Sequence, residues 1–425
     1  MRVLYCTDTY PPQVNGVSIV TALSVAGLQR RGWECTVVAP RYPEAVNVAS
    51  HGGADPASVP VTSLPSIAVP WYPDLRVAIA GLEPLRDLAR RFRPDLVHCA
   101  TEFSVGRMGQ RAATVAGLPL VSSYHTDWGR YADAYGVPWL RRAVTSHLTR
   151  FHARSRRVYT PSSAARRDLA GFGIEAVELW GRGVDTAVFH PGRRSQHLRE
   201  SLGMGSRFTF VHVGRLAAEK QVDLIVEAFR QALTMVPRGV IHLIIAGTGP
   251  CEARLKAAAP PGVTFLGFLD RQTALPDLYA NSDAFLFSSV TETLGLVVLE
   301  AMASGLPVIA APEGGVRDHL RDSLNGLSCA AGDAAAMALA MVLLVGEWEL
   351  TRRLSRAARR TAEALSWEGE LDRLDASYRE VCEDGVAVSA PAGKHARDRR
   401  PPAPLALGEH PPAVRLDEVL HDGQA

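Results

Sequence analysis

Short apolar runs alternate with amphipathic stretches along most of this chain, and this alternation constrains its fold more than any other feature. The first unit is an apolar run at 3–6, a loop that ends at Gly16, a helical pattern over 18–31 and an apolar run at 34–39. A strand, a loop that bears glycine, a helix and a second strand form the basic unit of a doubly wound parallel sheet. Because similar units recur along the chain, the sequence predicts the α/β class.

A polar, charged segment at 184–206 divides the alternating units into two series. With 425 residues the chain is too long for one hydrophobic core, so two domains of ordinary size are expected. We place the first domain at 1–183 and the second at 184–365, with a central cleft between them. A helix at 366–382 is expected to return to the first domain, and the Pro-, Gly-, Ala- and Arg-rich sequence at 386–425 is expected to be a disordered tail.

The composition argues against several classes of protein. A formal net charge of +2 lacks the basic excess that bulk nucleic-acid binding needs. The six cysteines form no CxxC or metal-ligand spacing, which fits reduced thiols in a cytosol. The N-terminus enters a strand directly, without a signal-peptide pattern, and no apolar run has the length of a membrane span. We therefore expect a cytoplasmic protein, at most peripheral at the inner membrane face.

Two carboxylates, Glu292 and Glu300, flank an apolar run between two predicted strands. The pattern predicts a helix that opens at about Thr293, whose free backbone N–H groups and partial positive charge would form an anion site. If the link is mostly helical, the glutamates lie roughly 12 Å apart, at about 1.5 Å per residue, which is about the reach of a nucleotide-sugar from sugar ring to ribose. The alternative is a solvated Glu292 before the helix and a Glu300 on its surface, and this segment alone does not decide between the two.

Two cations, Arg215 and Lys220, follow the first predicted strand of the second series. The carboxyl end of a parallel strand is a ligand position, and an Arg fork together with a Lys point charge neutralises a diphosphate. Two solvated loop residues remain the alternative. Gly247 lies in a Gly-Thr-Gly turn after the next strand, where a lone G-x-G is weak evidence for a dinucleotide site. We interpret it as a tight turn that also lines a nucleotide site.

His125 follows a predicted strand of the first series and precedes the polar Thr126 and Asp127. A single His is more often structural, but this position at a strand end makes His125 a candidate for hydrogen bonding to a sugar hydroxyl or for stabilising positive charge on a reacting sugar. Gly16 lies at the start of the first helix, where the backbone either approaches a ligand or turns sharply. A plain turn is the simpler interpretation of Gly16.

No metal site is expected, because the sequence contains no Asp-x-Asp, HExxH or Cys/His cluster. The charge on a leaving group would then be met by cations and by the helix dipole. Two predicted helices, at 82–93 and 139–157, have basic faces. These are either solvated faces or surfaces that attract an anionic membrane, which would matter if an acceptor is a lipid.

Together these segments resemble the retaining glycosyltransferases of the GT-B fold, in the large group known as family 4. The resemblance spans about 3–378 and rests on five motifs in this order: Pro-Pro-Gln-Val-Asn-Gly-Val at 11–17, Ser-Tyr-His-Thr-Asp at 123–127, Gly-Arg…Glu-Lys at 214–220, Ala-Gly-Thr-Gly-Pro at 246–250 and Glu-x7-Glu at 292–300. It implies two Rossmann-like, doubly wound domains that face a central cleft and close over a nucleotide-sugar donor.

The resemblance also implies a role for each motif. His125 and Glu292 would act at the donor sugar, His125 near the reacting carbon and Glu292 on the sugar hydroxyls. Gly16 would lie in the loop over the donor phosphates. The remaining donor contacts would be Arg215 and Lys220 at the diphosphate, the backbone of Thr293, Leu294 and Gly295 at a phosphate, Gly247 near the base and Glu300 at the ribose hydroxyls.

The family mechanism is transfer with retention, without a metal or other cofactor, in which the departing phosphate takes the proton of the acceptor. The opening motif most resembles GDP-mannose-dependent α-mannosyltransferases and related glycolipid enzymes, so we expect mannose transfer from GDP-mannose to a lipid or glycan acceptor. A UDP-sugar-dependent glycosyltransferase is the alternative, and a GT-B sugar-nucleotide epimerase is a more distant one. Aromatic residues in loops 42–73 and 129–138 are candidates either for acceptor binding or for packing.

Overall fold

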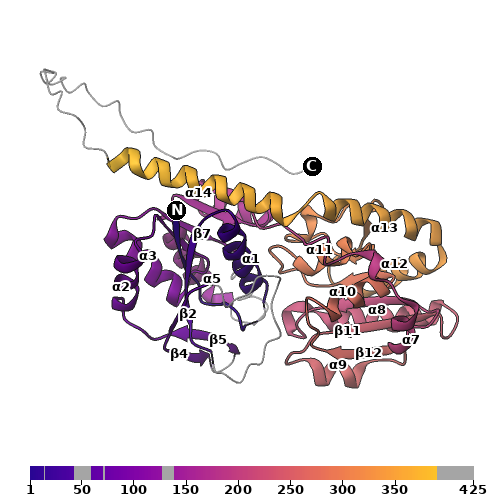
Figure 1. Cartoon of the computed structure of the whole chain (residues 1–425). Coiled ribbons are helices and arrows are strands. Elements are labelled where there is room, and N and C mark those ends of the chain that lie inside the picture. Colours follow the sequence, from indigo (N-terminus) through magenta and orange to yellow (C-terminus); the bar gives the residue numbers. More distant parts are fainter. Residues whose placement is uncertain (14, 43–58, 70–71, 127–137, 390–425) are drawn as a thin grey trace, which may run out of the picture.

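Two parallel sheets, each flanked by helices, build two α/β domains (Figure 1). The structure is a computed structural model that describes residues 1–13, 15–42, 59–69, 72–126 and 138–389. The predicted fold class, two doubly wound Rossmann-like domains, is confirmed.

The first sheet has seven strands in the order β3-β2-β1-β6-β7-β8-β9, and all the pairs are parallel. Its strands are β1 (Arg2–Cys6), β2 (Glu34–Pro40), β3 (Val61–Leu64), β6 (Leu96–Cys99), β7 (Leu120–Ser123), β8 (Arg157–Thr160) and β9 (Val177–Leu179). Its helices are α1 (Gly16–Arg30), α2 (Glu83–Phe92), α3 (Ser104–Ala116), α5 (Arg141–His152) and α6 (Ser163–Gly171). The strand order reverses between β1 and β6, so the crevice beside their carboxyl ends is a ligand position.

The second sheet has six parallel strands in the order β12-β11-β10-β13-β14-β15. Its strands are β10 (Phe208–Val213), β11 (Ile241–Ala246), β12 (Val263–Gly267), β13 (Ala284–Phe287), β14 (Val308–Ala310) and β15 (Gly326–Ser328). Its helices are α7 (Gln196–Ser201), α8 (Val222–Met235), α9 (Glu252–Ala258), α10 (Ala274–Asn281), α11 (Leu296–Ala303), α12 (Ala334–Gly346) and α13 (Trp348–Glu363). The central strands β10 and β13 are apolar and buried along nearly their whole length, as expected for strands covered on both faces.

The last helix, α14 (Trp367–Ser389), leaves the second domain and lies along the first (Figure 1). Leu371 on α14 packs so closely on α1 that a Cβ at Gly27 would lie 2.3 Å from its Cδ1. At the crossing point the Val184 N–H donates to the Leu365 carbonyl over 2.9 Å, so the two chain segments that join the domains run side by side. The helix continues to Ser389, past the predicted start of the tail at 386, and residues 390–425 lie outside the described residues.

Two of the predicted elements differ from the structure. The long basic helix predicted over 139–157 ends at His152, and Arg157 instead opens β8, where it pairs with Glu178 and Glu380. The region predicted to be mostly loop also holds an antiparallel pair, β4 (Ser66–Val69) and β5 (Tyr72–Ala78). The prolines in this segment read as loop signals, although proline is tolerated in edge strands such as these.

No single helix among the described residues is long and apolar enough to cross a membrane. Helices α12 and α13 reach that length and composition only as a pair, across a bend of 104°.

Candidate functional site

An ion pair between Lys220 and Glu292 marks the site in the second domain. Lys220 belongs to the loop after β10 and Glu292 to the loop after β13, two neighbouring strands whose carboxyl ends meet at one edge of the sheet. Ser289 Oγ donates to Glu292 Oε1 over 3.2 Å, and Ser288 Oγ donates to the Lys220 carbonyl over 2.7 Å. The charged side chains are only 18% and 21% exposed, so water screens their attraction less than it screens a surface pair.

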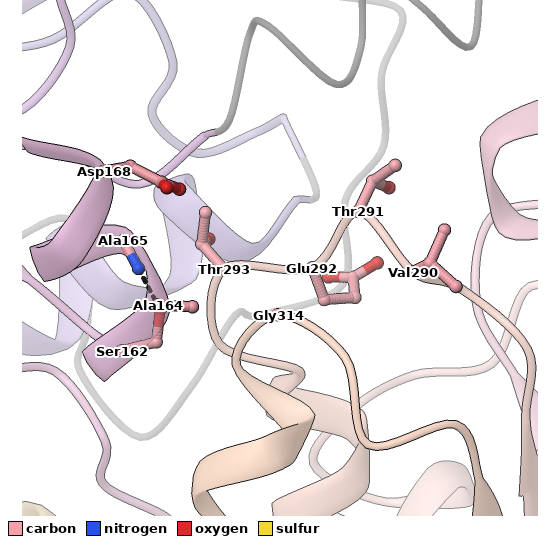
Figure 2. A pocket seen from close by; sticks show the side chains of 9 residues that line it. All are labelled: Ser162, Ala164, Ala165, Asp168, Val290, Thr291, Glu292, Thr293 and Gly314. Atoms are coloured by element: carbon pink, nitrogen blue, oxygen red, sulfur yellow. Dashed lines mark hydrogen bonds between the residues drawn. The ribbon is translucent and has the colours of Figure 1, made fainter. Parts of the chain in front are cut away.

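The first domain contacts the residue next to this ion pair through the backbone of His125. The hydroxyl of Thr293, the residue after Glu292, donates to the His125 carbonyl across the domain boundary. Figure 2 shows the narrow slot beside this contact. Helix α6 lines one side of the slot with Asp168 and with its N-cap residue Ser162, and the segment around Glu292 lines the other. The structure therefore brings Lys220, Glu292 and Thr293 together and places the backbone of His125 against Thr293.

The segment from Glu292 to Gly295 is a turn, and the helix predicted to open at about Thr293 begins only at Leu296. Gly295 has a left-handed φ of 74°, a conformation that favours glycine and that ends the turn before α11. The link between the two glutamates is therefore helical only from Leu296 onward. The turn still directs Thr293, Leu294 and Gly295 toward the N-terminal end of α11, where helix N–H groups favour an anion.

The loop that contains Gly314 and Gly315 packs against the backbone of this turn. The Gly315 N–H donates to the Glu292 carbonyl over 2.8 Å. A Cβ at Gly314 would lie 2.2 Å from the Glu292 carbonyl oxygen, and a Cβ at Gly315 would lie 2.2 Å from that of Thr293. Backbone packs directly on backbone here, and this fixes the direction in which the Glu292 side chain leaves the turn.

Glu300 lies one turn into α11 and is 1% exposed, which contradicts the alternative of a glutamate on the helix surface. Arg271, from the loop after β12, donates from Nε to Glu300 Oε1 over 2.7 Å. Burial raises the pKa of the Glu300 carboxyl, and the neighbouring Arg271 charge and the Tyr279 hydroxyl oppose that rise. The two glutamates thus have separate cationic partners, Lys220 for Glu292 and Arg271 for Glu300.

Arg215 and Gly247 lie in adjacent loops at the same edge of the second sheet. Arg215 is partly buried, and this burial lowers the pKa of its guanidinium, an effect that nearby Glu219 opposes. Gly247 has a φ of 137°, and a Cβ there would lie 1.9 Å from the Gly214 carbonyl oxygen. Glycine at 247 is therefore required by the close approach of two loops of the protein itself.

His125 is partly buried at the end of β7. Burial and, to a smaller extent, the charge of His152 lower the pKa of His125 to about 4, so the imidazole is neutral near pH 7. His152 is itself buried, with Nδ1 2.9 Å from Ser122 Oγ and Nε2 3.5 Å from Glu102 Oε1. A neutral His125 offers one donor and one acceptor nitrogen to a ligand.

Gly16 is the first residue of α1, and Asn15 caps the helix by accepting from the Ser18 N–H over 2.9 Å. Apart from its chain neighbours and the backbone of its own helix, no atom of the described residues lies within 4 Å of the place where a Cβ of Gly16 would stand. Neither φ nor internal packing requires glycine here, which leaves open space in front of the helix for an approaching group.

Two residues of the site were not predicted from the sequence. Arg271 follows strand β12 in the same way that Arg215 follows β10, so its place after a predicted strand was a usable signal. Asp318, in the 3-10 turn Val316–Asp318, accepts from the Ser163 N–H at the start of α6 over 2.7 Å and pairs with Arg182 over 3.1 Å. No sequence pattern marks Asp318 as a contact between the domains.

Among the described residues no group of three or more His, Cys, Asp or Glu side chains is arranged to hold a metal ion. The aromatic acceptor-loop candidates fall outside what the structure describes: the side chain of Tyr72 and the whole of Trp71, Trp128, Tyr131 and Tyr135. Asp127, the last residue of the motif at 123–127, also lies outside the described residues.

Family models match both halves of the chain. Residues 14–188 match the model described as Glycosyltransferase Family 4, and residues 207–347 match the model described as Glycosyl transferases group 1.

Two curated relatives are each 35% identical to this chain. One is the GDP-mannose-dependent alpha-mannosyltransferase of Mycobacterium tuberculosis (strain CDC 1551 / Oshkosh), aligned over 90% of this chain and 97% of that protein. The other has the same name, comes from Mycolicibacterium smegmatis, and is aligned over 90% of this chain and 98% of its own length. A solved structure of sucrose-phosphate synthase from Thermosynechococcus elongatus superposes with a TM-score of 0.74 at 19% identity, over 90% of this chain and 99% of that one, which supports the fold.

Proposed function

Because this chain belongs to glycosyltransferase family 4, we propose that it transfers mannose from GDP-mannose to a lipid or glycan acceptor with retention of configuration at the sugar. The donor and the sugar follow from the two mannosyltransferases that are 35% identical over nearly their whole length. The site supports the proposal through one observation above all: the Lys220–Glu292 pair adjoins Thr293, whose hydroxyl contacts the His125 carbonyl of the first domain.

At the sugar end, Glu292 would accept hydrogen bonds from the hydroxyls of the mannose. Its direction is fixed by the packing of Gly314 and Gly315 on its backbone, and such preorganisation makes a hydrogen bond effective in a transition state. His125, neutral near pH 7, would donate to a sugar hydroxyl without adding positive charge beside a carbon that itself becomes cationic.

At the diphosphate, Lys220 would exchange part of its interaction with Glu292 for the phosphate oxygens, and Arg215 would add a second cation. Backbone N–H groups at Thr293, Leu294 and Gly295 would complete the anion site before α11. Gly16 would leave room for the phosphates in front of α1. These groups supply the positive charge that leaving-group departure needs, so we propose that transfer requires no metal ion.

In the proposed reaction the bond between mannose C1 and the diphosphate oxygen breaks, and a bond between C1 and an acceptor hydroxyl oxygen forms on the same face. The hydroxyl proton passes to the departing diphosphate oxygen. Products are GDP and the mannosylated acceptor, and no oxidant or further reactant is needed.

We propose that the first domain contacts an anionic membrane when the acceptor is a lipid. The exposed arginines 90 and 91 on α2 and 141 and 142 on α5 support this proposal. Two of the α2 arginines have acidic partners within the helix, Arg86 with Glu83 over 2.8 Å and Arg90 with Asp87 over 3.6 Å, which reduces its net basic character. Co-sedimentation with anionic vesicles that disappears at high salt would support the contact, and equal binding to neutral vesicles would oppose it.

The reaction is tested by nucleotide release. Purified protein is incubated with GDP-mannose, GDP-glucose, UDP-glucose or UDP-galactose and a total lipid extract, with and without a chelator. We expect release of GDP from GDP-mannose above the other donors, at the same rate with chelator. Release from UDP-sugars alone would support the UDP-dependent alternative, and loss of release with chelator would overturn the metal-independent mechanism.

A further inference from the structure

Arg271 makes the ionic contact to the buried Glu300. Its Nε donates to Glu300 Oε1 over 2.7 Å, and its Nη2 lies 2.7 Å from the same oxygen. The side chains of Arg271 and Glu300 are 10% and 2% exposed, so water hardly screens the pair. Both contacts fall on Oε1, so Arg271 leaves the second carboxylate oxygen, Oε2, to other partners.

The guanidinium of Arg271 is itself held in place from two sides. Its carbon lies 5.2 Å from the ring centre of Phe189, in the segment that enters the second domain. Asp270 accepts from the N–H groups of Gln272 and Thr273, each over 3.0 Å, and so fixes the turn from which Arg271 leaves. A side chain ordered by packing and by a capped turn loses little entropy when it holds a partner.

A buried carboxyl without a cationic partner tends to take up a proton. A protonated carboxyl loses acceptor capacity, and hydrogen bonds to a neutral acceptor are weaker than those to a carboxylate. Two neighbouring ribose hydroxyls are donors that a carboxylate satisfies better than a carboxylic acid does. Whatever keeps Glu300 ionised therefore contributes to donor affinity without touching the donor.

We infer that Arg271 is a positioning residue for the donor: it keeps Glu300 ionised and oriented as the acceptor for the ribose hydroxyls. The inference rests on the proposed role of Glu300 in nucleotide-sugar binding. The loop after β12 would thus contribute to donor binding through the charge of Arg271 and through the orientation that Arg271 gives to Glu300.

The test is calorimetric titration of GDP into the full-length protein and its variants. Arg271→Gln is expected to weaken GDP binding by about tenfold or more near pH 7. The substitution removes the positive charge of Arg271, which opposes the rise in the pKa of Glu300 that burial causes. Arg271→Lys restores a positive charge and is expected to recover most of the affinity. The matched control is Arg193→Gln, which removes an arginine–carboxylate contact of 2.8 Å to Asp277 in the same domain and is expected to leave GDP binding unchanged.

The pH dependence separates positioning from a general structural defect. In Arg271→Gln the pKa of Glu300 rises further, so the ionised fraction falls as the pH falls. We therefore expect the loss of affinity to be larger at about pH 6 than at about pH 8.5, whereas the wild-type protein changes less over that range. A deficit of the same size at every pH, in a variant with a normal melting temperature, would overturn the inference. If Arg271→Gln does not fold, the same pH series is measured on Arg271→Lys. A lysine variant whose GDP affinity stays well below that of the wild type at every pH would also overturn the inference, because the lysine retains the positive charge.

A double-mutant cycle separates this inference from its premise. Glu300→Gln is expected to weaken GDP binding at every pH, and adding Arg271→Gln to it is expected to cause little further loss. If Glu300→Gln binds GDP like the wild type, the proposed role of Glu300 is wrong. If Glu300→Gln is weak but Arg271→Gln is normal, or if the two losses are additive, the role of Glu300 stands and the inference about Arg271 is wrong.

Discussion

At the scale of single residues, the site is a set of charged side chains that hold one another in place. Lys220 pairs with Glu292 and Arg271 pairs with Glu300, and each pair joins two different loops or elements of the second domain. A pair of this kind orients both side chains, so the loss of either member affects the one that remains. The two glutamates nevertheless serve different ends of the donor in the proposed function, which makes their variants distinguishable.

Glu292→Gln is expected to reduce turnover far more than donor binding. The substitution keeps the shape of the side chain but removes the charge beside the sugar, and the loss of one preorganised electrostatic contact costs on the order of 10²-fold in kcat. GDP lacks the sugar, so its affinity is expected to change by less than about threefold, which corresponds to well under 1.4 kcal/mol. Steady-state kinetics and GDP titration check this, and an equal loss in both would assign Glu292 to the nucleotide end.

At the scale of elements, the turn from Glu292 to Gly295 depends on a neighbouring loop that contributes no side chain. Gly314 and Gly315 lie directly against the carbonyls of Glu292 and Thr293. The direction of the Glu292 side chain is thus set by a contact between two loops, the one that connects β13 to α11 and the one that connects β14 to β15.

Gly314→Ala is expected to lower both stability and turnover. The residue has a φ of 54°, and its new Cβ would lie 2.2 Å from the Glu292 carbonyl oxygen, so the loop must move. Gly332→Ala is the matched control, because Gly332 has a φ of 77° but no atom within 4 Å of its Cβ position. The control is expected to cost only about 1–2 kcal/mol for the left-handed backbone, and Gly314→Ala is expected to cost more. Denaturant unfolding and kcat measure the two effects, and equal stability losses with normal turnover would refute the bracing role of this loop.

The positions of strands and helices in this chain were largely predictable, because buried parallel strands and amphipathic helices leave strong periodic signals. The start of α11 was not, since Thr293 and Leu294 fit a helical pattern and only Gly295 signals the left-handed residue before it. Glu292, Arg215 and Lys220 were predicted from their places after strands, and Glu300 from its place at the far end of an apolar run. The ion-pair partners were not found, because sequence does not show which cation meets which carboxylate.

At the scale of the whole molecule, several contacts between described residues relate the two domains. The chain crosses twice at Val184 and Leu365, α14 lies along the first domain, and Thr293 reaches His125. Asp318 adds a contact from the second domain to the first residue of α6 and to Arg182. A site formed by both domains depends on these contacts for its geometry.

Asp318→Ala is expected to loosen the domain arrangement, because it removes a hydrogen bond of 2.7 Å to the Ser163 N–H and an ion pair of 3.1 Å to Arg182. Small-angle scattering is expected to show a larger radius of gyration than for the wild type. Asp322→Ala is the control, since Asp322 accepts from the Ser328 N–H within the second domain. An unchanged radius for Asp318→Ala, or the same increase in both variants, would show that Asp318 does not hold the domains together.

The free energy of unfolding is expected to fall as the pH falls from about 6.5 toward about 4. Burial lowers the pKa of His98 to about 3 and lowers those of His125, His212, His242 and His319 to about 4. In the unfolded chain these imidazoles take up protons near pH 6.5, so the unfolded state binds more protons than the folded state in this window. Denaturant midpoints measured at several pH values check this, and a midpoint that rises or stays constant on acidification would contradict the burial of neutral histidines.

Titration of GDP-mannose into the wild-type protein, in the presence of a chelator, is the measurement that tests the central proposal most directly. We expect one donor to bind per chain, about tenfold or more weakly in Glu300→Gln and with little change in the control Arg193→Gln. No binding of GDP-mannose by the folded wild-type protein, together with binding of a UDP-sugar or binding only after a divalent metal is added, would contradict it.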